Sequence, residues 1–418
     1  MLYFKLVADC GLDTLGVRDI AEDRTRIAVF APSLLSARLV VAVSLIVVLT
    51  AVGLAVLPQP EGAIISAYGI SLIAVAAGTR WVVLGIDQAG RVALARIAGE
   101  ATTALLALAL VRDLGDLGRM PALQFVGDAL TAFLLIWFLQ RAGIRLPVAL
   151  DWSLVLPVLR RSWPLVAHGL LGLLIFNSDF FFLRAFRSSA VVGLYAAAYT
   201  LVSFILNLGG AYGISLLPVM TRLGVDLPGQ RRLYDTAMAQ VFAAAMPMTL
   251  GGFLLADGII DVMFGARYAA SAVPLRILLW TLPVALFRNV AQSALIARGR
   301  QDRVLRTSGW AAAVNLALNA AIIPVLGMTG AALSTLVTES VRTGVSLWFA
   351  RGAGLPITSP RRFWRTIVAA GAMVGVVAWA RFGSVWLAVA IGSTAYIVAL
   401  LLLGGLKVRR GTLPELTV

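Results

Sequence analysis

The sequence is poor in the residues that most enzymes use for catalysis and metal binding. It contains one cysteine, Cys10, and one histidine, His168, among 418 residues. A single cysteine allows no intrachain disulfide bond and no paired-cysteine metal or redox site, and a single histidine allows no histidine-based metal cluster. We therefore expect no metal site and no cofactor, and we interpret His168 as a helix residue whose ring hydrogen-bonds to a neighbouring group.

Charged residues are scarce as well. Only 13% of the residues are charged and 60% are hydrophobic, and the mean hydropathy is +0.92. This composition leaves too little polar surface for a soluble globule of this length, so it predicts an all-α polytopic membrane protein. The net charge of +15 would also suit a nucleic-acid-binding protein. However, the arginines lie in loops between apolar runs, without interleaved aromatic residues, so the charge reflects membrane topology.

Two long apolar runs near the middle of the chain are the strongest structural signal. Residues 163–183 and 191–217 are each long enough, at about 1.5 Å per residue, to cross a hydrocarbon core of about 30 Å. The connector between them, residues 184–190, is too short to hold a folded unit. The pattern therefore predicts a hairpin of two neighbouring antiparallel membrane helices.

The same criterion of length and hydropathy predicts further membrane spans on both sides of this hairpin, which brings the total to about twelve. They cover residues 28–57, 62–84, 92–111, 122–138, 234–263, 270–297, 308–326, 330–350, 363–380 and 385–403. Residues 1–15 are apolar but too short to span a bilayer, so they read as the second half of a leading helix.

These spans suggest a division of the chain into two helical lobes joined by an arginine-rich amphipathic linker. The predicted parts are an N-terminal lobe at 1–140, a cytoplasmic linker at 141–161, a C-terminal lobe at 162–352, two additional transmembrane helices at 353–406 and a cytoplasmic tail at 407–418. The stretch 11–40 has the same plan as 213–242, a helix end followed by an arginine-bearing loop and a new helix, which indicates parallel repeats.

The distribution of arginines over the loops predicts the orientation in the membrane. When alternate loops are assigned to alternate sides, one side keeps only Arg112, Arg119, Arg184, Arg187, Arg267 and Arg381. The much richer opposite side is cytoplasmic by the positive-inside rule, and so is the C-terminus. All loops on the poorer side are short, so nothing outside the membrane is large enough to fold as a domain.

Several stretches together resemble a known family. They are LVADCGLDTLGVRDIAEDR at 6–24, NSDFFFLRAF at 177–186, VGLYAAAYTL at 192–201, LLPVMTRL at 216–223, FGARYAASAVPLRIL at 264–278 and NLALNAAIIPVLGMTGAALSTLVTE at 315–339. In this order they resemble the bacterial polysaccharide transport family, the flippases of O-antigen and exopolysaccharide repeat units. This family belongs to the multidrug/oligosaccharidyl-lipid/polysaccharide exporter superfamily, with the multidrug and toxin extrusion transporters and the lipid II flippases.

The resemblance implies two pseudo-symmetric helical lobes around a central cavity, with two extra C-terminal helices. It also implies a transporter and not an enzyme, which moves an undecaprenyl-diphosphate-linked oligosaccharide from the cytoplasmic to the periplasmic leaflet by alternating access. Such flippases act in the bacterial inner membrane in lipopolysaccharide and exopolysaccharide biosynthesis, where a polysaccharide polymerase and export machinery are the expected partners. Family members usually start earlier, so about one and a half helices are expected to be missing before Met1.

Ionisable residues inside the predicted spans are functional candidates, because each costs about 2.5 to 3.5 kcal/mol or more if it faces lipid. They are Arg38, Arg80, Glu100, Asp128, Arg276, Arg288, Glu339 and Arg342. A diphosphate needs fixed positive charge, which guanidinium supplies with two parallel donors. We nominate Arg80 and Arg288 as phosphate contacts and Arg38 and Arg276 as second choices. The alternative is that these arginines reach to the interface or pair with Glu100, Asp128 or Asp87.

The remaining polar candidates are carboxylates and amides. Glu100, Asp128 and Asp179 are candidates for a coupling proton or for counter-ions, and Asp179 alternatively lies near the headgroups beside Arg184 and Arg187. We expect Glu339 and Arg342, three residues apart, to pair with each other. The amides that are expected either to contact sugar hydroxyls or to pack between helices are Asn289, Gln292, Asn315 and Asn319.

Three other functions compete with a flippase. A drug or cation exporter of the same superfamily would favour a cavity of carboxylates, because arginines repel cations. A membrane polysaccharide polymerase or glycosyltransferase would need catalytic groups on a sizeable outer loop, which this chain lacks. The chain as given is alternatively an inactive fragment.

Overall fold

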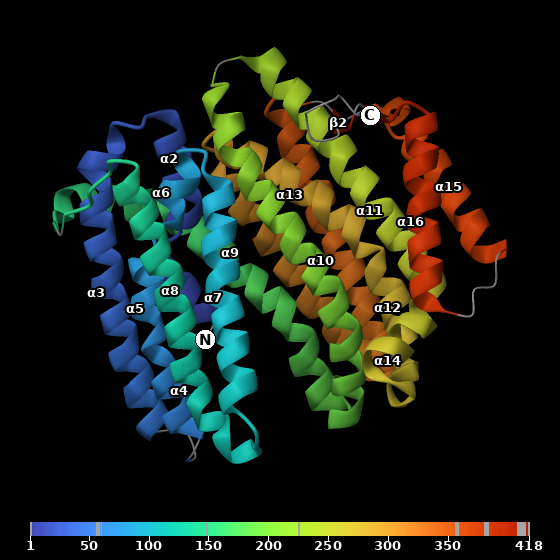
Figure 1. Cartoon of the computed structure of the whole chain (residues 1–418), viewed down its shortest axis with the longest axis horizontal. Helices are drawn as coiled ribbons and strands as arrows, with labels where there is room; N and C mark the ends of the chain where they lie inside the picture. The colour runs from blue at the N-terminus through green and yellow to red at the C-terminus, as the bar shows by residue number, and fades with distance from the viewer. Residues whose placement is uncertain are drawn as a thin grey trace. The chain divides into compact units, whose positions relative to one another are not determined.

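The computed structural model describes residues 2–55, 59, 61–147, 149–224, 226–355, 359–379, 384–407 and 415–416. Within these residues the chain is almost entirely helical (Figure 1), which confirms the predicted all-α fold. The helices are α1 Leu2–Asp9, α2 Leu12–Glu22, α3 Arg26–Ala55, α4 Glu61–Gly69, α5 Ser71–Ala77, α6 Arg80–Gly85, α7 Ala89–Leu110, η1 Leu114–Arg119, α8 Met120–Arg141, α9 Trp152–Phe186, α10 Ser189–Arg222, α11 Leu227–Phe264, η2 Ala266–Ser271, α12 Ala272–Leu279, α13 Thr281–Ala297, α14 Gln301–Gly352, η3 Pro360–Arg362, α15 Trp364–Trp379 and α16 Val385–Leu402.

Ten helical segments in the described part of the chain are long and apolar enough to cross a membrane. One of them, α14, is 52 residues long and is interrupted at Gly327, whose backbone is not helical (φ 56°, ψ −131°). This break divides α14 into the two predicted spans 308–326 and 330–350. With that division and the shorter apolar helix α15, the protein is a multi-pass membrane protein whose described helices account for the twelve predicted spans.

The break in α14 is capped from another helix end. The Arg187 guanidinium, just after α9, donates hydrogen bonds to the carbonyl oxygens of Pro324 and Val325 at 2.8 Å and 3.1 Å. These carbonyls precede the break, where a helix end leaves carbonyls without intrahelical donors. The arginine therefore satisfies the acceptors that the interruption at Gly327 would otherwise leave unpaired.

The chain forms two compact units. Unit 1 contains Met1–Leu173 and Leu217–Arg222, and unit 2 contains Leu174–Leu216 and Leu223–Val418. The predicted central hairpin is present as α9 and α10, which are separated by only two residues. Residues 152–161 of the predicted linker are the beginning of α9, where the Asp151 carboxylate accepts a hydrogen bond from the Ser153 backbone amide at 2.9 Å. Because α9 and α10 each contribute to both units, the division falls within helices and not in a loop.

The first helices of unit 1 bend sharply and then pack closely. Cys10 and Gly11 have left-handed backbone conformations (φ 56° and 73°), which separate α1 from α2. The next helix, α2, lies against α6, and a Cβ atom placed on Gly16 would lie 2.5 Å from the Trp81 ring. Trp81 is only 2% exposed, so glycine at position 16 is what allows this contact.

The two C-terminal helices belong to unit 2. Helices α15 and α16 pack on α11, and the Tyr396 hydroxyl donates a hydrogen bond to the Ala243 carbonyl oxygen at 2.6 Å. A buried cluster that includes Met373 and Leu400 fills the space between them. Leu406–Lys407 then pairs with Glu415–Leu416 as a short antiparallel ladder. The rest of the predicted tail at 407–418 lies outside the described residues.

We expect Gly16→Ala to destabilise the protein by about 1–3 kcal/mol, because the methyl group overlaps the rigid Trp81 ring. Thermal unfolding of the purified chain in detergent measures the effect. Gly90→Ala is the matched control, since a Cβ atom there meets nothing within 4 Å and alanine favours a helix. Equal melting temperatures for the two variants would contradict the proposed close packing of α2 on α6.

Candidate functional site

Arg38 is buried in unit 1 and holds several groups together. Its side chain, on α3, forms an ion pair with Asp9 of α1 at 3.1 Å. It also donates hydrogen bonds to the carbonyl oxygens of Val75 and Gly78, both at 3.1 Å. These carbonyls lie at the end of α5, where the chain leaves the helix before α6 begins. Arg38 is 2% exposed, so its position fits a structural ion pair that neutralises Asp9 and caps α5.

Arg80 has a similar acidic partner but is more open. It is the first residue of α6, and its guanidinium lies 3.0 Å from the Asp13 carboxylate of α2. The two side chains are 29% and 30% exposed. Asp13 and Asp9 are themselves linked, because the Asp13 backbone amide donates to the Asp9 carboxylate at 3.2 Å. Unit 1 thus brings two of the four nominated arginines onto two neighbouring carboxylates.

Unit 2 contains a buried cluster of two arginines on one carboxylate. Arg288 of α13 lies 2.9 Å from one oxygen of Glu339, and Arg342 lies 3.2 Å from the other. This confirms the predicted Glu339–Arg342 pair and adds Arg288 to it. Arg288 also donates to Gln292 at 3.3 Å, and Arg342 donates to Ser308 at 3.2 Å. The three ionised groups carry a net charge of +1, and Arg288 is the most exposed of them at 13%.

Asp179 lies in a second buried cluster of unit 2, made of neutral donors. Its carboxylate accepts hydrogen bonds from the Tyr195 hydroxyl at 2.8 Å, from the Asn319 side-chain amide at 2.7 Å and from the Thr335 hydroxyl. Asn315 also belongs to this cluster, because the Asn319 side-chain amide donates a hydrogen bond to the Asn315 side-chain oxygen at 3.3 Å. Asp179 is 1% exposed, so the alternative that placed it near the headgroups beside Arg184 and Arg187 is wrong.

The composition of the Asp179 cluster limits what it can hold. In the described part of the chain no three His, Cys, Asp or Glu side chains come together as a metal site would require. The groups around Asp179 donate hydrogen bonds to it, so they stabilise its ionised form and do not present a set of oxygen ligands to a metal cation. Asp179 is therefore a single buried carboxylate and a candidate for binding a proton.

The other nominated residues are scattered. Arg276 pairs with Asp257 in unit 2, and Asp128 accepts from Lys5 at 2.9 Å in unit 1. Glu100 is exposed on α7. Asn289 of α13 faces α10, where a Cβ atom on Gly213 would lie 3.4 Å from the Asn289 Cβ atom.

The predicted counter-ions of the arginines were wrong. Glu100, Asp128 and Asp87 pair with none of the four nominated arginines in the described residues, because Asp9, Asp13, Asp257 and Glu339 lie closer to them. Asp87 instead binds Arg24 at 3.4 Å and Arg222. Asp9 and Asp13 lie in the apolar segment 1–15, which is too short for a full membrane span and so falls outside the criterion of an ionisable residue within a span. Tyr195 and Thr335 carry no such sequence signal.

We expect Glu339→Gln to destabilise the protein by about 3–5 kcal/mol, because it leaves Arg288 and Arg342 buried without a compensating charge. Glu100→Gln is the matched control, since that side chain is exposed and its substitution should change stability by no more than about 0.5 kcal/mol. Melting temperatures of the two purified variants provide the measurement. A Glu339→Gln variant as stable as the control would show that the cluster does not depend on ion pairing.

Two comparisons of the sequence with known proteins give matches. A family model described as polysaccharide biosynthesis protein matches residues 1–224. The probable flippase AglR of Haloferax volcanii is 26% identical over 168 residues, which are 39% of this chain and 35% of AglR. The chain thus spans about a third of the length of this curated relative.

Solved structures share the fold over most of the chain. Lipid II flippase MurJ in an inward closed conformation has a TM-score of 0.66 at 12% identity, over 96% of this chain and 92% of MurJ. The Vibrio cholerae MATE transporter VcmN in the bent form has a TM-score of 0.65 at 19% identity, over 84% and 85% of the two chains. At these identities the likeness concerns the fold, and it confirms the expected fold class.

Proposed function

Because the chain belongs to the polysaccharide biosynthesis protein family, we propose that it is a flippase that translocates an undecaprenyl-diphosphate-linked oligosaccharide across a membrane. The direction would be from the cytoplasmic to the periplasmic leaflet of the bacterial inner membrane, with the C-terminus in the cytoplasm. The product would serve surface polysaccharide biosynthesis, of lipopolysaccharide or exopolysaccharide, beside a polymerase and export machinery. The similarity to the probable flippase AglR supports a flippase activity.

The observation that carries this proposal is the excess positive charge of the Arg288–Glu339–Arg342 cluster. Two guanidinium groups share one carboxylate in the interior of an apolar helical unit. A diphosphate satisfies such an excess by accepting paired hydrogen bonds from guanidinium, whereas a cationic drug is repelled by it. Arg288 is the best placed to release Glu339 and bind phosphate, because Arg342 would still neutralise the glutamate. Gln292, hydrogen-bonded to Arg288, is a neighbouring candidate for a sugar hydroxyl.

The Asp179 cluster supplies a candidate for coupling. Helix α14 contributes to both clusters of unit 2, since Thr335 donates a hydrogen bond to Asp179 and Glu339 pairs with Arg288. Protonation of Asp179 removes one negative charge from this interior and so increases its net positive charge, which favours an anionic headgroup. In this proposal proton binding at Asp179 promotes diphosphate binding at Arg288, and Asn315 and Asn319 position the carboxylate instead of contacting sugars.

The roles of the other nominated residues follow from their partners. In unit 1, Arg80 is a stronger candidate for a phosphate contact than Arg38, because it is more exposed and because Arg38 also donates hydrogen bonds to two carbonyl oxygens. Arg38 and Arg276 act as counter-ions of Asp9 and Asp257, and Asp128 as the counter-ion of Lys5. Asn289 remains a candidate sugar contact.

We expect Arg288→Ala to reduce translocation by about 10- to 100-fold, since it removes charge-assisted hydrogen bonds worth about 1.5–3 kcal/mol, while the Glu339–Arg342 pair keeps the unit folded. The assay follows access of an added glycosidase to a lipid-linked oligosaccharide in proteoliposomes. Arg112→Ala, in an exposed loop, is the control. Full activity of Arg288→Ala would remove this residue from the site. Efflux of a cationic dye without oligosaccharide translocation would favour the drug exporter.

We expect Asp179→Asn to abolish the dependence of translocation on a pH gradient, because asparagine cannot bind and release a proton. The same proteoliposomes, with and without an imposed pH difference, measure the ratio of rates for the variant and the wild type. Asp257→Asn, whose carboxylate is 72% exposed, serves as the control. A wild-type rate that responds to a sodium gradient and not to pH would assign a metal cation to the cluster.

A further inference from the structure

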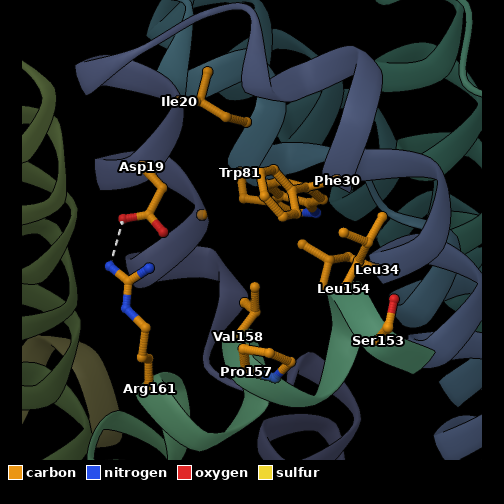
Figure 2. Close-up of a pocket in the computed structure, with 11 residues that line it drawn as sticks. Asp19, Ile20, Phe30, Leu34, Trp81, Ser153, Leu154, Pro157, Val158 and Arg161 are labelled. Atoms are coloured by element: carbon orange, nitrogen blue, oxygen red, sulfur yellow. Dashed lines mark hydrogen bonds and ion pairs between the residues drawn. The ribbon is translucent and has the colours of Figure 1, made fainter. Parts of the chain in front are cut away.

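Unit 1 contains a cavity of about 350 Å³ that none of the proposed transport steps uses. It lies between α2, α3, α6 and the beginning of α9 (Figure 2). Most of its wall is apolar and comes from Phe30, Leu34, Trp81, Leu154 and Val158. Cavities of this size and character bind small molecules or one segment of a larger one.

One end of this cavity is charged. Figure 2 shows Arg161 of α9 pointing toward Asp19 of α2, on the side away from Phe30 and Leu34. The Asp19 carboxylate lies 2.7 Å from the Arg18 guanidinium and 3.5 Å from that of Arg161. Two guanidinium groups therefore lie against one carboxylate at this end. Arg161 is also half exposed, at 50%, whereas Arg18 is only 7% exposed, so Arg161 presents this charge at the surface.

The helix that closes the cavity also has an exposed apolar face. Trp152, Leu156 and Trp163 of α9 are 49%, 48% and 60% exposed, whereas Leu154 and Val158 of the same helix line the cavity. In a membrane protein such a face is covered by lipid, and tryptophan is enriched where the acyl chains meet the headgroups. In the predicted orientation the arginine-rich loops are cytoplasmic, so this end of unit 1 lies at the cytoplasmic interface. The cavity is thus separated from the bilayer by one amphipathic helix.

We propose that this cavity is a binding site for an anionic phospholipid of the surrounding bilayer. One acyl chain occupies the apolar part, between Leu34, Trp81 and Leu154, and the phosphate of the headgroup contacts Arg161. The apolar wall accommodates the acyl chain, the half-exposed Arg161 guanidinium at one end suits the anionic headgroup, and the exposed face of α9 indicates that the ligand comes from the membrane. The lipid links the start of α9 to α2, α3 and α6, and its presence stabilises unit 1 whether or not the protein is a flippase.

Native mass spectrometry of the delipidated full-length chain tests this site with two probes, phosphatidylglycerol and phosphatidylethanolamine of identical chain length. We expect one phosphatidylglycerol molecule to be retained per chain in preference to phosphatidylethanolamine, and to raise the melting temperature. Arg161→Gln should weaken phosphatidylglycerol retention about fivefold, the effect of one basic residue at an anionic headgroup. Arg145→Gln, an exposed arginine before α9, should leave retention unchanged.

Filling the cavity tests the place of the acyl chain. Leu154→Trp should abolish retention of both lipids, whereas Leu156→Trp, on the exposed face of the same helix, should retain them. If Leu154→Trp does not fold, Val158→Phe and the surface substitution Arg161→Gln decide the question. Equal retention of the two lipids, or equal loss in Arg161→Gln and Arg145→Gln, overturns the proposal. Displacement of phosphatidylglycerol by undecaprenyl phosphate also overturns it, by assigning the cavity to the tail of a transport substrate.

Discussion

The requirement that a charge buried among apolar helices must have a partner organises this structure. Almost every ionisable side chain in the interior of either unit lies against an opposite charge or a group of hydrogen-bond donors. Arg38 neutralises Asp9, Glu339 holds two arginines, and Asp179 is surrounded by hydroxyl and amide donors. Unpaired charges at these depths would cost several kcal/mol each, so the positions of the helices and of these partners depend on one another.

The same requirement distinguishes charged residues that can bind a ligand from charged residues that only stabilise the fold. A balanced pair such as Arg38 with Asp9 has little capacity left for a ligand, because a phosphate would have to displace the carboxylate and two hydrogen bonds to carbonyl oxygens. An unbalanced cluster is different, since its excess charge is compensated only in part by the protein. The Arg288–Glu339–Arg342 cluster of unit 2 has this property, and it is where an anion is expected.

The sequence was sufficient for the fold because hydrophobic length and arginine-bearing loops are local features. The turn between α9 and α10 lies within the predicted connector 184–190, although α9 begins at Trp152 and not at residue 163. The predicted separation of spans 308–326 and 330–350 corresponds to the break at Gly327. Pairing of charges is not local. Asp13 and Arg80 are 67 residues apart, and Tyr195 and Asp179 lie on different helices. Which carboxylate an arginine meets depends on how the helices rotate and bend, including the bend at Cys10 and Gly11, and spacing along the chain does not reveal it.

The interruption of α14 has a consequence for the buried carboxylate of Asp179. Its donors come from both sides of Gly327, with Asn319 in the first half of α14 and Thr335 in the second. Arg187 donates to the carbonyls that precede the break, so the two halves of α14 meet at Gly327 without leaving these backbone acceptors unpaired. The hydrogen bonds of Asp179 therefore depend on the angle between the two halves, because each half supplies one of its donors.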